Sequence, residues 1–252
     1  MEFNDRIDPL IVRRASRRPA VMERRAWLLL SLLAFGTAGG ANEPTQISVW
    51  RDSLTTRLEA LALLETLNAD LLSHNSATKT LERWCDAHHL ASPTTVTAER
   101  VSEDKPVSDE QRRILEIGPA EPVRYRRVRL HCGAHVLSQA DNWYVPRRLT
   151  SDMNRQLETT DRAFGRVIEP LHFRRETLSA TLLWQPLPPG WEMGAATAIP
   201  RTEGRLEFPE DLLEHRAVLR TPEGKPLSLV VETYTSGIFA FPEPAPSEHT
   251  GS

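Results

Sequence analysis

The segment Val123–Pro146, VRYRRVRLHCGAHVLSQADNWYVP, limits the fold more than any other part of the chain. Its alternation of residue types predicts a strand, a turn and a second strand. Because side chains alternate between the two faces of a strand, Arg127, Arg129 and His131 share one face. The apolar residues of the same strand lie on the other face: Val128, Leu130 and Cys132.

The arginine-bearing face of this strand predicts a binding pocket for a small carboxylate. Positive charges beside a buried sheet are costly unless an anion meets them. A guanidinium fork fits a carboxylate through two donors, which lysine cannot do. The alternative is that Arg127 is a solvated strand residue, which is the default for arginine.

Helices are predicted before this hairpin and mostly antiparallel strands after it. Leucines recur at spacings of three and four over 51–72, which is typical of an amphipathic helix. A second helix is predicted over 77–89, and a last hairpin over 213–220 and 227–234. This order indicates an α+β domain, with a central antiparallel sheet and helices on one of its faces.

The N-terminal region has the pattern of a secretory signal peptide. Residues 1–25 hold seven arginines against four acidic residues, and the uncharged stretch AWLLLSLLAF follows. This stretch of about ten residues is too short to span about 30 Å of hydrocarbon as a helix. The signal is therefore predicted over 1–41, with Met22 as an alternative start. An N-terminal membrane anchor that is never cut is the other interpretation.

Removal of the signal would leave a domain over 42–240 and a tail over 241–252, whose composition predicts disorder. The mature protein is then predicted to be periplasmic or secreted, without a stable membrane span. N-terminal sequencing of protein from its native cell should start near Asn42. An intact Met1 or Met22 on soluble cytoplasmic protein would contradict export.

Net charge, cysteine count and motif spacing bear on nucleic-acid binding, disulfide pairing and metal binding. The formal net charge is −3, so binding to nucleic acid is not expected. Cys85 and Cys132 could pair in an oxidising compartment, but two unpaired buried thiols are favoured, because cysteine is often simply a core residue. The sequence has no CxxC motif and no His/Cys metal spacing, so no metal is expected.

Four segments resemble, in the same order, the chorismate pyruvate-lyase family. They are Leu71–Cys85, Val123–Pro146, Arg162–Leu178 and His215–Tyr234. The first contains LLSHNSATKTLE between two helices, the third contains the FGR run, and the fourth contains GKPLSLVVE in a hairpin. Each motif is weak by itself, and their shared order carries the resemblance.

The resemblance implies a chorismate lyase-like fold that encloses a ligand cavity. It also implies an elimination, in which chorismate loses pyruvate and becomes 4-hydroxybenzoate without a metal or organic cofactor. By motif position, Arg127 matches the arginine that holds the ring carboxylate. Glu232 is the nearest match to the glutamate at the ring hydroxyl, so both are predicted to be catalytic. The other predicted ligand-binding residues are Ala77, Phe164, Gly165 and Arg175.

The position of Glu232 departs from the family pattern. It lies one residue farther from Gly224-Lys225-Pro226 than the pattern requires. A slip of one residue turns a strand side chain to the opposite face. Glu232 therefore faces the cavity only if the turn before the strand absorbs the extra residue.

Two functions follow from the resemblance. The first is a secreted, monomeric chorismate lyase-like enzyme. The second is a non-catalytic periplasmic protein that binds a small aromatic carboxylate, because the same fold occurs in the UTRA effector-sensing domains of transcription regulators. Residues 115–130 also resemble a run of those domains. No helix-turn-helix pattern precedes them, so a DNA-binding regulator is not expected.

Overall fold

The computed structural model describes residues 50–194 and 204–244. The predicted signal peptide over 1–41 lies outside the described residues, as does the chain from 245 onward. No helix within the described ranges is long and apolar enough to cross a membrane.

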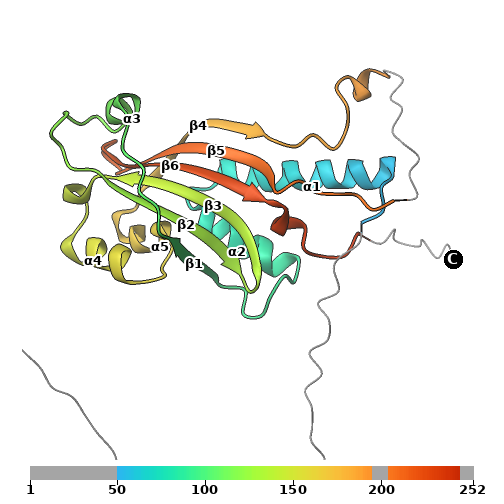
Figure 1. Cartoon of the computed structure of the whole chain (residues 1–252), viewed down its shortest axis with the longest axis horizontal. Helices are drawn as coiled ribbons and strands as arrows, with labels where there is room; N and C mark the ends of the chain where they lie inside the picture. The colour runs from blue at the N-terminus through green and yellow to red at the C-terminus, as the bar shows by residue number, and fades with distance from the viewer. Residues whose placement is uncertain (1–49, 195–203, 245–252) are drawn as a thin grey trace, which may run out of the picture. The chain divides into compact units, whose positions relative to one another are not determined.

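Six strands form one sheet in the order β1-β2-β3-β6-β5-β4, and every neighbouring pair is antiparallel (Figure 1). The predicted α+β class with a central antiparallel sheet is therefore confirmed. The strands are β1 Val96–Val101, β2 Arg124–Cys132, β3 His135–Tyr144, β4 Arg174–Leu182, β5 Asp211–Arg220 and β6 Pro226–Thr235.

The longest helices, α1 and α2, begin at serine caps. The Ser53 side chain accepts a hydrogen bond from the Thr56 backbone N–H, and the Ser76 side chain accepts one from Lys79. Each cap satisfies a backbone donor that the first turn of a helix leaves free. The helices are α1 Leu54–Ser73, α2 Ala77–Ala87, α3 Asp109–Ile114, α4 Ser151–Thr159 and α5 Phe164–Val167.

The apolar residues of β2 project from one face of the sheet, which we call the helical face. The helices α1, α2, α4 and α5 cover it. The leucines of α1 and α2, such as Leu64 and Leu81, pack there with Val128 and Leu130. Residues of α4 and α5, including Leu157 and Phe164, cover the other end of the same face. The helix α3 is the exception, because the segment following it packs on the opposite face. Its contacts there are Leu115 with Trp143, Val218 and Leu229.

Cys85 of α2 and Cys132 of β2 form a disulfide, so the expectation of two unpaired thiols is wrong. Their Cα atoms lie 6.3 Å apart, within the range that a disulfide bridges. The sequence spacing gave no signal for this pairing, because it depends on where α2 packs across the sheet. A loop of 47 residues closed in this way stabilises the fold by about 4 kcal/mol in the chain-entropy treatment.

The segment that follows Ala240 is packed against the start of the domain, so a tail that is disordered from 241 is wrong for its first residues. Trp50 Nε1 donates to the backbone oxygen of Phe241 at 2.9 Å, and the two rings lie edge to face. The Glu243 carboxylate accepts hydrogen bonds from the Arg51 backbone and the Thr56 hydroxyl. The charged and proline-rich composition of the tail hid this aromatic contact.

Candidate functional site

An inner cavity lies between the helical face of the sheet on one side and, on the other, the turn between α1 and α2 together with α5. Its empty volume is about 490 Å³, counted with the solvent at its mouth. Most of its wall is apolar, but four strands of the sheet, β2, β3, β4 and β6, each contribute one polar side chain: Arg126, Asn142, Arg175 and Glu232.

Five of the six predicted ligand-binding residues line this cavity. Ala77 comes from the first turn of α2, Phe164 and Gly165 from α5, Arg175 from β4 and Glu232 from β6. The helix caps and the strand register bring these residues together over long distances in the sequence. The sheet thus contributes the charged side chains of the cavity wall, and the helices α2 and α5 contribute the wall that faces the sheet.

The sixth predicted residue, Arg127, projects from the opposite face of β2, so its assignment as anchor is wrong. It forms ion pairs there with Glu103 at 3.1 Å and Asp141 at 3.6 Å. Strand alternation separates it from Val128 and Leu130, which line the cavity. A cavity needs a second layer to enclose it, and around β2 the helices supply that layer only on the apolar face.

Arg126, the neighbour that the sequence analysis passed over, occupies the position expected for the anchor. Only 6% of its surface is exposed, and its Nη2 donates to the Arg162 backbone oxygen at 3.0 Å. Its Nε and Nη1 are buried without an acceptor among the described residues. None of the ion pairs in the part of the chain that the structure describes includes Arg126.

The surroundings of Arg126 disfavour its charge. Burial, and then the nearby charge of Arg100, lower the pKa of Arg126 to about 10, although Tyr144 and Asp161 act in the opposite direction. The guanidinium nevertheless remains protonated at neutral pH. A buried cation with free donors is stabilised when an anion binds beside it.

Asn142 is a second polar residue of the cavity that the sequence analysis missed. It pairs directly with Arg126 across β2 and β3, so both side chains project from the helical face. Its Oδ1 atom is buried and has no donor among the described residues. A sequence signal for both residues exists. Each is a polar residue at a strand position whose side chain projects to the same face as the neighbouring apolar residues.

Glu232 faces the cavity, because the register of β5 and β6 shifts between Leu219 and Arg220. This bulge next to the turn absorbs the extra residue of the sequence. Arg175 Nη2 donates to Glu232 Oε2 at 2.5 Å, and Tyr234 Oη donates to the same oxygen at 3.1 Å. The charge that Arg175 was expected to offer a ligand is therefore matched by Glu232.

Burial and charge tune this polar cluster. Burial alone would lower the pKa of Arg175, but the adjacent Glu232 carboxylate raises it above its usual value. Burial raises the pKa of Tyr234, and the Glu232 charge acts in the same direction. Arg175 is thus held as a guanidinium, and Tyr234 is held as a neutral donor.

His215 lies next to this cluster, since it is paired with Glu232 across β5 and β6. The ring is fully buried, and its Nε2 lies 2.8 Å from Asn68 Oδ1, so Nε2 carries the proton. Burial, and then the Arg175 charge, lower the pKa of His215 to about 4, although Glu232 acts in the opposite direction. The imidazole is therefore neutral in the folded protein at pH 7.

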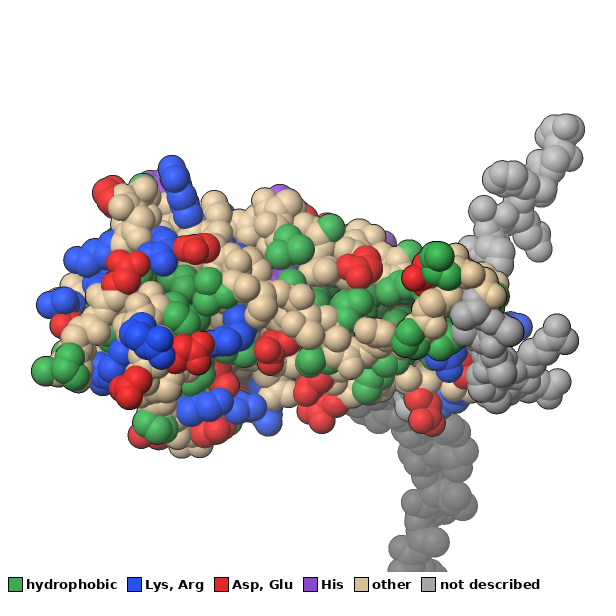
Figure 2. Space-filling model, turned by 90° about the horizontal axis from the view of Figure 1, so that it is seen from above, with side chains coloured by type: hydrophobic (Ala, Val, Ile, Leu, Met, Phe, Trp, Pro, Cys, Tyr) green, Lys and Arg blue, Asp and Glu red, His purple; other side chains and the backbone are tan. Residues whose placement is uncertain are grey.

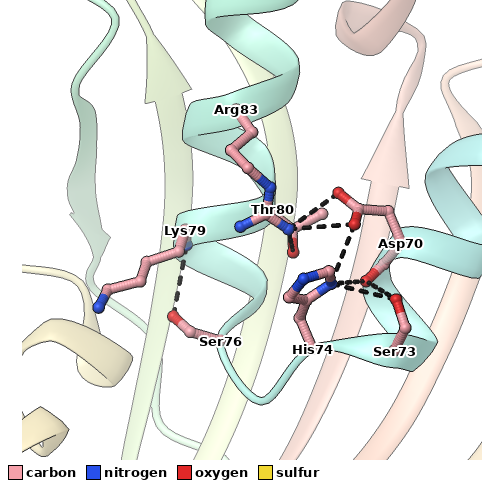
Figure 3. A network of polar contacts seen from close by, with 7 residues as sticks. All are labelled: Asp70, Ser73, His74, Ser76, Lys79, Thr80 and Arg83. Atoms are coloured by element: carbon pink, nitrogen blue, oxygen red, sulfur yellow. Dashed lines mark hydrogen bonds and ion pairs between the residues drawn. The ribbon is translucent and has the colours of Figure 1, made fainter.

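An outer pocket of about 630 Å³ adjoins the inner cavity beside the α1–α2 turn. Its wall carries basic and imidazole groups, among them His74, Lys79, Arg83 and His172. Figure 3 shows His74 and Arg83 directed toward Asp70, whereas Lys79 extends away from them. Arg83 Nη2 donates to Asp70 at 2.9 Å, and Lys79 pairs with Glu169.

Charges of both signs are mixed on the face seen in Figure 2, most densely at the end of the sheet near α3 and α4. A basic stripe, which would mark a surface for nucleic acid, is not seen on this face. Among residues 50–194 and 204–244, no group of three or more His, Cys, Asp or Glu residues could hold a metal ion.

The fold and site define an α+β protein with a cavity between its sheet and helical segments. A comparison with protein-family models finds no match. The chain is 52% identical over 197 residues to the "uncharacterized protein y4mC" of Sinorhizobium fredii. The aligned region covers 77% of this chain and 83% of that protein. The chain therefore belongs to the same family as that protein.

Solved structures give a more distant likeness. The effector domain of PhnF from Mycobacterium smegmatis is 12% identical with a TM-score of 0.42, covering 64% of this chain and 88% of that chain. The possible transcriptional regulator YydK from Bacillus subtilis is 14% identical with a TM-score of 0.36, covering 60% of this chain. The chain spans 62% of YydK, which is less than two thirds of that protein. Scores this low support no inference about function.

The neutral state of His215 predicts an acid-sensitive fold. Its folded-state pKa lies below the ordinary value of 6.5, so the unfolded state binds more protons between pH 6.5 and about 4. Stability should therefore fall as the pH is lowered through this window, by at most about 1.4 kcal/mol per pH unit for one group. Urea unfolding at pH 7 and pH 5 measures this.

His215→Gln should reduce the difference between the two pH values, whereas His135→Gln, at a half-buried position in β3, should leave it unchanged. An equal pH dependence in wild type and His215→Gln would show that His215 is not the responsible group.

Proposed function

We propose that the inner cavity binds a small carboxylic acid with an apolar or aromatic body, and that Arg126 is its anchor. The observation that carries this proposal is the pair of buried, unpartnered donors on the Arg126 guanidinium. A bound carboxylate would supply the missing charge and an acceptor for one of these two donors. The proposed anchor is therefore Arg126 and not the neighbouring Arg127, whose side chain projects from the opposite face of β2.

The rest of the cavity wall supports the same ligand class. Phe164 and Phe173 come from opposite ends of the α5 region, and with Val128 and Leu130 they offer apolar surface for a ring or a short aliphatic chain. Asn142 Oδ1 needs a donor, which a ligand hydroxyl or amide would provide. An aromatic acid with a hydroxyl group, such as 4-hydroxybenzoate, satisfies these requirements.

Elimination of pyruvate from chorismate is a second candidate function. The observation that favours it is the presence of Glu232 in the same cavity as Arg126. Chorismate would lose its side chain by cleavage of the carbon–oxygen bond, giving 4-hydroxybenzoate and pyruvate with no net gain or loss of atoms. Glu232, held by Arg175 and Tyr234, would accept a hydrogen bond at one end of the ring.

We also propose that the protein is exported into an oxidising compartment. The arginine-rich start and short apolar core of the sequence motivate it. The disulfide between Cys85 and Cys132 supports it, because structural disulfides persist mainly in oxidising compartments.

Loss of the Arg126 charge should weaken binding of 4-hydroxybenzoate. We expect Arg126→Gln to cost roughly 2–4 kcal/mol of binding free energy, because the buried carboxylate loses its charged partner. Calorimetry on the folded protein measures this. Arg127→Gln is the matched control, since it removes the same charge from the opposite face and should change the affinity little. Equal losses in both variants would count against the cavity as the site.

Turnover separates the second candidate from a binding protein. If the domain is a lyase, it should release pyruvate from chorismate faster than the spontaneous decay, with a chelator present. Glu232→Gln should then lower kcat by about tenfold or more while the affinity changes less. A wild-type rate equal to the spontaneous rate would remove the enzyme and leave the binding protein.

A further inference from the structure

The inner cavity and the outer pocket share one wall. Four residues line both hollows: Asn75, Ser76, Gly165 and Phe173. Two of them belong to the turn between α1 and α2, and Gly165 belongs to α5. The boundary between the hollows is therefore formed by short side chains, apart from Phe173.

Gly165 leaves space at this boundary. A Cβ atom placed there would lie 3.5 Å from Ser76 Oγ, 3.6 Å from Thr78 Oγ1 and 3.8 Å from the tip of Phe173. These are ordinary contact distances, so an alanine would fit, but a larger side chain would fill the space between the two hollows. The backbone at Gly165 does not require glycine, because it is not in the left-handed region.

The outer pocket presents donors that a ligand can reach. Lys79 and Arg83 are both more than 40% exposed, and so is Glu169, the partner of Lys79. Exposed ion pairs contribute little to stability, so a ligand oxygen can replace their carboxylates at small cost. His74 and His172 add further nitrogen atoms to the same wall.

We propose that the two hollows are compartments of one binding site, and that its ligand is an elongated acid rather than a single substituted ring. One anionic end lies at Arg126, an apolar section passes Gly165 and Phe173, and a second polar end that accepts hydrogen bonds lies near Lys79 and Arg83. Gly165 then determines how long a ligand the site accepts. This inference rests on the proposed anchor at Arg126.

Two probes that share a benzoate ring test the inference. Benzoate has only the ring and the carboxylate expected at Arg126, whereas N-(4-carboxyphenyl)succinamate extends the same ring acid at its para position by an amide and a second carboxylate. Calorimetry on the folded protein should show the extended probe binding tighter by about tenfold or more. The ratio of the two affinities is the measured quantity.

Variants at the boundary and in the outer pocket should remove this advantage. Gly165→Val should bring the ratio close to one, because its side chain fills the passage. Gly118→Val is the matched control, since a Cβ atom at Gly118 meets nothing within 4 Å, and it should retain the wild-type ratio. Lys79→Met combined with Arg83→Met changes only exposed side chains and should also lower the ratio.

The outcomes distinguish the two proposals. If benzoate binds and the extended probe binds no better, the two-compartment site is wrong and the Arg126 site stands. If neither probe binds the wild-type protein, the Arg126 site fails and this inference fails with it. If Gly165→Val does not fold by circular dichroism, the ratio in the Lys79 and Arg83 double variant decides.

Discussion

A guanidinium enclosed under helices without a carboxylate partner is the constraint on which this structure depends. Arg126 projects from the apolar face of β2, where the burial of Val128 and Leu130 fixes the strand's orientation. Reversing that orientation would expose an apolar row, so the fold holds Arg126 in place despite the cost of its charge. The cavity beside it is the space in which that cost can be recovered by an anionic ligand.

The second buried arginine shows why Arg126 is distinctive. Arg175 is nearly as buried, and its Nε also has no acceptor among the described residues, but its charge is paired with Glu232, to which Tyr234 also donates. One wall of the cavity is therefore neutral overall, and the other carries a free positive charge. That asymmetry orients a ligand with one acidic end. The disulfide from α2 to β2 adds a covalent link between the lid and the strand that carries the anchor.

Much of the fold could be predicted from the sequence, because the leucine spacing of α1 and the alternation of β2 are strong local signals. The position of Glu232 could not, since a bulge between Leu219 and Arg220 decides which way it faces. Three arginines within four residues of β2 alternate between the faces, and attention to the charged face selected Arg127 instead of Arg126. The disulfide and the packing of Phe241 on Trp50 depend on contacts between distant segments, which local patterns do not encode.

The most direct measurement is a crystal structure of the protein soaked with 4-hydroxybenzoate. The account predicts one carboxylate in the inner cavity, with an oxygen about 3 Å from Arg126 Nε or Nη1, and the ring against Phe164 and Phe173. A ligand at Arg127 on the opposite face, or an inner cavity that stays without ligand at saturating concentration, would contradict it.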